Sequence, residues 1–210
     1  MKLVKLSALL LVAIAFTQCG KDAAPVSAPA MLPVDAPLIV RVNDAEKFTA
    51  FSDSIALPYV QAIDVAALNK YSNGPWTGAL VASGADKFDW IWTFKDTLGQ
   101  GGSMTENETI YSIDSLYGFK VGSTWTISKK SALLQDLLNQ RANGFSLAKD
   151  AQFSSLWNSA SKADVMNLFI QHKEIAAVGN QFFQQDWSWM THVAAWSEID
   201  LALRKNKLIG

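Results

Sequence analysis

The sequence predicts an α+β domain: a largely antiparallel sheet with helices packed on one side. Short segments rich in β-branched and aromatic residues alternate with segments of helical periodicity, and turn residues separate neighbouring strand-like segments. Half of the 210 residues are apolar and eight are tryptophan, which supplies ample apolar area for a buried core. Hairpin-like spacing of the strands favours antiparallel pairing over a parallel barrel or a helical bundle.

The first expected strands carry their apolar residues in alternation. Residues 38–42 form one strand, and residues 76–82 and 88–94 form a hairpin around the turn at 83–87. In the second strand of the hairpin, the aromatic side chains share one face because successive residues point to opposite sides. They are Phe88, Trp90, Trp92 and Phe94. This pattern predicts a strongly apolar sheet face.

Further strands are expected along the rest of the chain. They are residues 109–113, 116–121, 124–128, 165–171 and 193–203, then a turn at 205–207 and the beginning of a strand at 208–210. So short a final strand leaves backbone groups of its neighbour unpaired. We therefore expect the chain to be truncated at its C-terminus, with the strand at 193–203 lacking its partner and the isolated chain prone to aggregation.

The expected helices carry apolar residues at spacings of three and four. One follows Asn43-Asp44 and contains Phe48 and Phe51; the others begin at Pro58, cover 132–141, follow Asp150, and cover 175–183. The polar turn, strand and helix at 34–48 resemble those at 163–174 in order but hardly in sequence. Two related strand-helix modules and a chance likeness of common units both remain open.

The N-terminal segment indicates export. Lys2 and Lys5 precede an apolar run at 6–16 that only Ser7 interrupts, and Cys19, the chain's only cysteine, follows shortly; residues 1–18 therefore form a predicted signal peptide. The apolar run is about half of the ~20 residues that a spanning helix needs, so a transmembrane anchor is the weaker alternative. We expect Cys19 to be acylated, for example with palmitate; cleaved secretion without a lipid is the other alternative.

The region after the cysteine divides into a tether and a folded domain. Residues 19–31 are the expected lipid-anchored tether, because the stretch is rich in alanine and proline, has no apolar period, and is extended and semi-rigid. The α+β domain is expected at 32–210, beginning near Leu32. With a single cysteine, no disulfide can stabilise the chain internally.

Residues 16–19 (Phe-Thr-Gln-Cys) resemble the lipoprotein box of bacterial lipoproteins, although Gln18 stands where a small residue is usual. Such relaxed boxes are similar to those of Bacteroidota lipoproteins, and residues 20–22 (Gly-Lys-Asp) resemble signals that direct some of them to the outer surface. The resemblance implies a location in the cell envelope, at the outer membrane or cell surface.

The body of the chain also resembles a family. Residues 32–36 before a strand, and residues 146–153 followed by Ala163-Asp164 and another strand, resemble uncharacterised Bacteroidota lipoproteins of the domain-of-unknown-function class. The resemblance covers most of the mature chain through short motifs. It implies an α+β fold with recurrent strand-helix units in a longer protein, and it brings no activity and no site residues.

Charge and histidine content exclude several function classes. Without Lys2 and Lys5 the mature chain has 16 basic and 19 acidic residues, and this mildly acidic balance argues against nucleic acid as a partner. No basic amphipathic stretch is available for anionic lipid headgroups, so the link to the membrane is the lipid anchor or none. His172 and His192 lack the spacing of a metal site, and we expect neither a metal nor a cofactor.

Two clusters near the C-terminus are candidate sites. Trp187 and Trp189 lie in a polar segment and are possible ligand-stacking residues, with a core or cap role as the alternative. Asp186, Glu198 and Asp200 lie near these tryptophans in the chain, and a glycosidase needs two carboxyl groups beside rings on which sugars stack. Proximity along the chain does not establish that geometry.

The sequence favours a non-catalytic function. The anchor, the tether and the absence of a convergent set of titratable residues predict a membrane-anchored envelope lipoprotein that acts as a binding or structural module. Its partner is an unknown protein or a glycan, and no catalytic residue is expected. The alternative is a glycan-active hydrolase that uses carboxylates, such as Asp186 and Glu198, near Trp187 and Trp189.

Overall fold

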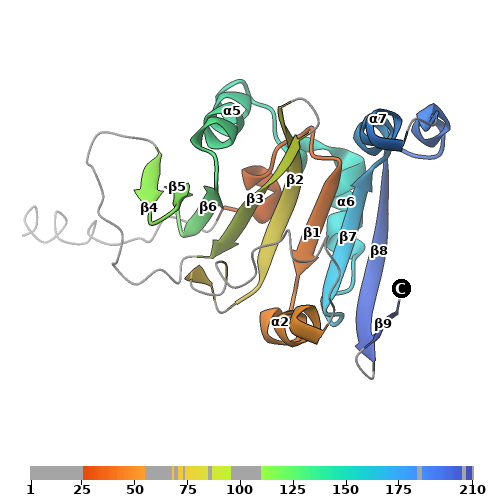
Figure 1. Ribbon diagram of the computed structural model, residues 1–210, viewed down its shortest axis with the longest axis horizontal. Coiled ribbons are helices and arrows are strands. Elements are labelled where there is room, and N and C mark those ends of the chain that lie inside the picture. Colours follow the sequence, from red (N-terminus) through yellow and green to blue (C-terminus); the bar gives the residue numbers. More distant parts are fainter. Residues whose placement is uncertain are drawn as a thin grey trace, which may run out of the picture.

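The fold is one antiparallel sheet with helices, which confirms the predicted α+β class. The computed structural model describes residues 26–54, 68, 71–72, 74–84, 87–95, 110–183, 186–204 and 207–209. Within this part of the chain, nine strands follow the order β4-β5-β6-β3-β2-β1-β7-β8-β9 (Figure 1). Every neighbouring pair is antiparallel, as the hairpin spacing predicted.

The element boundaries agree closely with those expected from the sequence. The strands are β1 (Leu38–Val42), β2 (Trp76–Gly84), β3 (Lys87–Lys95), β4 (Tyr111–Ile113), β5 (Leu116–Val121), β6 (Thr124–Ser128), β7 (Met166–Gln171), β8 (Trp196–Arg204) and β9 (Lys207–Ile209). The helices are α2 (Ala45–Ser54), α5 (Ser131–Ala142), α6 (Ala151–Ser159) and α7 (His172–Phe183), with short 3-10 helices η1 (Ala28–Met31), η2 (Leu147–Lys149) and η3 (Ser188–His192).

The centre of the sheet repeats one arrangement twice. β1 is followed by α2 and then by the antiparallel strands β2 and β3, and β7 is followed by α7 and then by β8 and β9. Because β1 and β7 are antiparallel neighbours, α2 and α7 lie at opposite ends of the sheet (Figure 1). The two strand-helix units therefore share an order of elements.

The two faces of the sheet bury separate cores. On one face, which we call the α6 face, Ile39, Ile91 and Phe169 pack with residues of η1, α5 and α6, among them Leu134 and Phe153. The opposite face, which we call the tryptophan face, buries the predicted aromatic alternation of β3. Its core includes Trp76, Trp90, Trp92 and Phe94 together with Phe48 of α2. Thus α5 and α6 share one side, whereas α2 contributes to the other.

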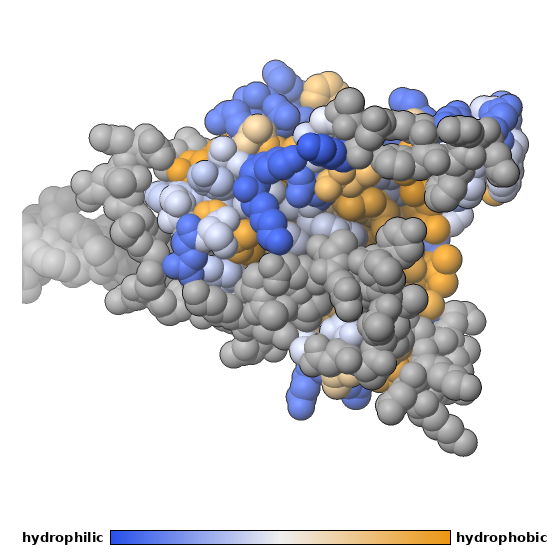
Figure 2. Space-filling model, in the orientation of Figure 1, coloured by the Kyte–Doolittle hydropathy of each residue, from blue (hydrophilic) through white to orange (hydrophobic). Residues whose placement is uncertain are grey.

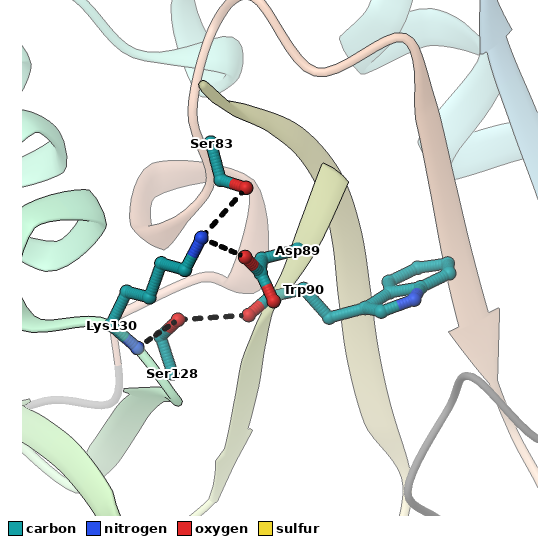
Figure 3. A network of polar contacts seen from close by, with 5 residues as sticks. All are labelled: Ser83, Asp89, Trp90, Ser128 and Lys130. Atoms are coloured by element: carbon teal, nitrogen blue, oxygen red, sulfur yellow. Dashed lines mark hydrogen bonds and ion pairs between the residues drawn. The ribbon is translucent and has the colours of Figure 1, made fainter. Parts of the chain in front are cut away.

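Polar contacts attach the start of α5 to the hairpin formed by β2 and β3 (Figure 3). The Lys130 ammonium lies 2.6 Å from a carboxylate oxygen of Asp89 and donates to the Ser83 hydroxyl over 3.0 Å. Burial alone would raise the pKa of Asp89, but hydrogen bonds from Lys130 and Ser83 lower it below its usual value. In β6, the Ser128 hydroxyl donates to the Trp90 carbonyl oxygen. These contacts fix α5 over one end of the α6 face.

The folded body begins before Leu32, earlier than expected. Met31 is fully buried, and the carbonyl oxygen of Val26 accepts a hydrogen bond of 3.0 Å from the Thr124 hydroxyl. Proline-rich composition suggested a tether, but Pro29 and Met31 are buried in η1, and Met31 packs into the core of the α6 face. The signal peptide, Cys19 and the first part of the predicted tether lie outside the described residues.

The later elements begin at slightly different residues from those expected. The strand predicted at 193–203 begins at Trp196; it pairs with β7 from Trp196 to Leu201, and the short final strand β9 pairs with its residues Ala202, Leu203 and Arg204. The helix expected at 175–183 begins three residues earlier, at His172. Most of the helix expected after Pro58 lies outside the described residues. Leu68 and Tyr71, which are described, are both helical.

Candidate functional site

A row of polar side chains crosses the apolar α6 face. Residues paired directly across neighbouring strands lie on the same face, so one register line can be followed through six strands. From β8 to β6 this line contains Asp200, Asn167, Arg41, Thr77, Thr93 and Thr126. We call it the polar row. Five of its six members are among the buried polar residues, and Asp200 is half-buried, so the row interrupts the hydrophobic core.

Arg41 connects the polar row to helix α6. Its side chain is only 6% exposed, and its Nε donates to Asn167 Oδ1 over 2.8 Å. The two terminal nitrogens donate to the carbonyl oxygens of Trp157 (2.8 Å) and Ala160 (3.0 Å), at the C-terminus of α6. A cation at this position also interacts favourably with the helix dipole. Arg41 therefore joins β1, β7 and α6 through three hydrogen bonds.

Aromatic rings enclose the guanidinium group. Its central carbon lies 4.7 Å from the ring centre of Trp157 and 5.7 Å from that of Phe169. Phe153 packs against both rings and against Trp196, whose indole nitrogen donates to Asp150 over 3.1 Å. Asp150 also caps α6 by accepting from the Phe153 N–H, as the sequence predicted. The rings make the surroundings of the charge less polar than water, which strengthens its interactions.

Two carboxyl groups of β8 complete the cluster and titrate differently. Asp200 Oδ1 accepts from the Ser161 N–H over 3.0 Å and from the Asn167 amide. Burial alone would raise the pKa of Asp200, but hydrogen bonds from Glu198, Ser161 and Asn167 lower it below its usual value. Burial and the neighbouring Asp200 raise the pKa of Glu198 to about 7. Below about pH 7, Glu198 thus holds a proton beside an ionised Asp200.

A cavity of about 240 Å³ adjoins the middle of the polar row. Arg41, Thr77 and Thr93 line it from the sheet, and Trp157 lines it from α6. The rest of its lining consists of Val26, Ala28, Val42, Asn43, Pro75, Trp76, Phe94, Lys95 and Thr124. The N-terminal segment that the sequence assigned to the tether therefore helps to form the cavity wall.

Unpartnered polar groups lie at this cavity. The Thr93 hydroxyl is buried, with the residue 1% exposed, and it has no hydrogen-bond partner within the described part of the chain. The hydroxyl of Thr126, the next member of the row, is also buried and unpartnered but does not line the cavity. Three of the five N–H groups of Arg41 make the bonds above, and among the described residues none accepts from the other two. Unpaired donors at a cavity suit a ligand that supplies acceptors.

The predicted stacking residues have different surroundings. The Trp187 ring lies directly on the backbone of α7, where a Cβ added at Gly179 would come within 2.5 Å of it. Trp189, in η3, is 60% exposed. Trp187 thus has the cap role that the sequence left open, and Trp189 alone of the two presents most of its ring to solvent.

The two acids of the predicted hydrolase are in separate environments. Asp186 is exposed, and hydrogen bonds from the Ser188 hydroxyl and N–H lower its pKa. Glu198 titrates under the influence of Asp200, Arg41 and Asn167, and Asp186 is not among its neighbours. The structure therefore does not bring Asp186 and Glu198 together, and it places Glu198 in hydrogen-bond contact with Asp200 instead.

Sequence reasoning missed two sites that the sheet assembles. Arg41 was simply one residue of a strand, and only strand register shows its alignment with Asn167 and Asp200. His172, which the sequence analysis considered only as a metal ligand, is buried: Nδ1 lies 3.2 Å from the Met190 carbonyl oxygen and Nε2 lies 2.6 Å from the Ser197 hydroxyl. Because a carbonyl only accepts, Nδ1 donates to the Met190 carbonyl oxygen. His172 thereby joins η3 to β8.

Comparison with known proteins provides no family for the chain: no protein-family model matches it, and no curated protein or solved structure is detectably similar. Within the described ranges, no group of three or more histidine, cysteine, aspartate or glutamate residues could hold a metal ion. Among the helices in the described part of the chain, none is both long enough and apolar enough to cross a bilayer.

The acid pair predicts an unusual pH dependence of stability. The raised pKa of Glu198 means that the folded state binds more protons than the unfolded state between its usual value, 4.5, and about 7. The free energy of unfolding therefore falls as pH rises through this window. Lowering the pH from about 8 to about 5.5 should raise the melting temperature by roughly 4–8 °C.

The matched variant is Glu198→Gln, which is uncharged at every pH and nearly isosteric. It should flatten this part of the profile, whereas Asp186→Asn should leave the profile as in the wild type. Melting curves recorded by circular dichroism across the pH range provide the measurement. Identical profiles for the wild type and Glu198→Gln would contradict the assignment of the proton to Glu198.

Proposed function

We propose that the chain is an exported, lipid-anchored envelope protein whose folded body binds a small polar ligand without turning it over. The observation that carries the proposal is the Thr93 hydroxyl, which is buried and unpartnered in the wall of the cavity beside Arg41. A polar group left unpaired in a core costs free energy, so a bound ligand that accepts its hydrogen bond would recover that cost. The location rests on the N-terminal segment and on its resemblance to Bacteroidota lipoproteins.

The expected anchor lies close to the body. Seven residue steps separate Cys19 from Val26, whose carbonyl oxygen is bonded to β6. Fully extended, that segment spans at most about 25 Å. If Cys19 is acylated, the sheet and its cavity are held near the membrane surface rather than on a long stalk.

Charge and size restrict the ligand. Asp200 offsets the positive charge of Arg41, so the site has no large excess charge with which to attract an anion. The cavity is smaller than the about 300–1,000 Å³ typical of sites for drug-sized ligands and would hold about eight waters at ~30 Å³ each. A neutral ligand with hydroxyl or amide groups, such as a monosaccharide unit, fits these limits.

The anchor is tested by metabolic labelling. Cells that express the full chain and are fed radiolabelled palmitate should incorporate label into the wild type and not into the Cys19→Ser variant, because only the thiol can be acylated. Trp189→Ala serves as an exported control that keeps the cysteine. Equal label in the wild type and Cys19→Ser, or none in either, would contradict lipid anchoring at this residue.

Ligand binding is tested by calorimetric titration with neutral monosaccharides and small amides. Thr93→Val keeps the side-chain shape and removes the hydroxyl, and we expect it to weaken binding by about two- to tenfold, the usual contribution of one hydrogen bond. Thr126→Val is the matched control, since it removes a similarly buried, unpartnered hydroxyl outside the cavity; its affinity should equal that of the wild type.

Three results would contradict the proposal. No saturable response to any probe, or equal affinities for Thr93→Val and the wild type, would remove the cavity as the binding site. Release of product from an oligosaccharide, followed by chromatography, would instead support the glycan-active hydrolase. In that case Glu198→Gln would have to abolish turnover while retaining binding.

A further inference from the structure

Trp189 differs from every other tryptophan of the chain in its exposure. All eight tryptophans lie in the described part of the chain, and the other seven are buried or half-buried, whereas Trp189 is 60% exposed. It lies in η3, the short turn between α7 and β8. A ring this exposed contributes little to the core, so its large apolar faces are available for contact with a ligand.

The turn that carries Trp189 is fixed to the body of the protein on both sides of the ring. The Trp187 ring packs on the backbone of α7 at Gly179, and the Trp187 N–H donates to a side chain of the same helix. The carbonyl oxygen of Met190 accepts a hydrogen bond of 3.2 Å from Nδ1 of the buried His172. The backbone of Trp189 is therefore ordered in advance, which lowers the entropy cost of binding.

The immediate neighbours of Trp189 are polar. Residues three apart lie on the same side of a 3-10 helix, so the exposed His192 shares the side of Trp189. Within the described part of the chain, Asp186 accepts hydrogen bonds from the Ser188 hydroxyl and N–H at Oδ1 only, and these bonds lower its pKa. Beside α7 (Figure 1), the surface at this corner of the molecule is mainly hydrophilic (Figure 2).

An exposed ring with polar neighbours suits a sugar better than a lipid surface or an apolar protein surface. A pyranose packs the C–H groups of one face on the indole, while the hydroxyl groups at its rim reach polar side chains. A lipid or an apolar partner would instead remove water from the ionised carboxyl group of Asp186 without supplying a donor. The same negative charge disfavours acidic sugars.

We propose that Trp189 is a stacking platform for a pyranose ring of a neutral, β-linked glycan chain. Such chains have flat pyranose faces, and Asp186 and His192 supply hydrogen bonds to the hydroxyl groups of the stacked ring. The platform is independent of the cavity at Thr93, because no residue of α7 or η3 lines that cavity. The chain would thus have a surface site for a glycan in addition to an enclosed site for a small ligand.

The test is an NMR titration of the mature chain, carrying Cys19→Ser so that no lipid is attached, with cellotetraose and chitotetraose. The indole N–H signal of Trp189 is identified as the one that is missing from the spectrum of Trp189→Tyr. At least one of the two glycans should shift this signal saturably. The signals of the buried tryptophans should stay in place, because their rings do not contact the glycan.

Variants of the exposed ring separate stacking from general apolar contact. Trp189→Ala and Trp189→Leu both lack a flat ring and should weaken binding at least about tenfold, whereas Trp189→Tyr should stay within about threefold of the wild type. The matched control is Val193→Ala, since Val193 follows η3 directly and is also 60% exposed. Its affinity, followed like the others through backbone amide signals of η3, should equal that of the wild type.

Each other outcome overturns the proposal. No saturable shift with either glycan, or equal affinities of Trp189→Leu and the wild type, excludes stacking on this ring. Thr93→Val should bind the glycan as the wild type does, and a loss in this variant would place the glycan in the cavity instead. Co-sedimentation with phosphatidylcholine–phosphatidylglycerol vesicles that Trp189→Ala abolishes would assign the ring to a membrane surface.

Discussion

The buried guanidinium group of Arg41 is the constraint on which the rest of the structure depends. It lies at the centre of the sheet, on the strand between β2 and β7, and its three hydrogen bonds run to Asn167 and to the last carbonyl groups of α6. Burying a charge is costly unless partners are already in place. The register of β1 with β7, the end of α6 and the position of Asp200 are therefore linked through one side chain.

The same charge explains the features that are unusual in this core. Arg41 requires acids nearby, and Asp200 and Glu198 occupy the strand beyond Asn167. Crowding of these two carboxyl groups raises one pKa and lowers the other. On the other side of Arg41, the row continues through threonine hydroxyls that no described residue satisfies at Thr93 and Thr126. The cavity lies where this row passes beneath Trp157 and the N-terminal segment.

Local features of the fold could be predicted from the sequence, whereas the site could not. The alternating aromatic residues predicted the buried face of β3, and Asp150 predicted the start of α6. Both predictions were possible because each pattern lies within a few neighbouring residues of the sequence. The polar row instead joins residues up to 159 positions apart, from Arg41 to Asp200, through strand register. The composition of the predicted tether was misleading, because Val26 and Met31 in this segment pack into a core formed by residues distant in the sequence.

The most direct test of this account is the free energy of unfolding of Arg41→Met, measured by urea titration against the wild type. Methionine preserves much of the apolar bulk, but it leaves Asn167 and the α6 carbonyl groups without their shared donor and Asp200 without the neighbouring positive charge. The account predicts a loss of about 3–5 kcal/mol, the usual result of removing one partner from a buried charged cluster. A loss below about 1 kcal/mol, within the range of ordinary surface substitutions, would contradict the central role of Arg41.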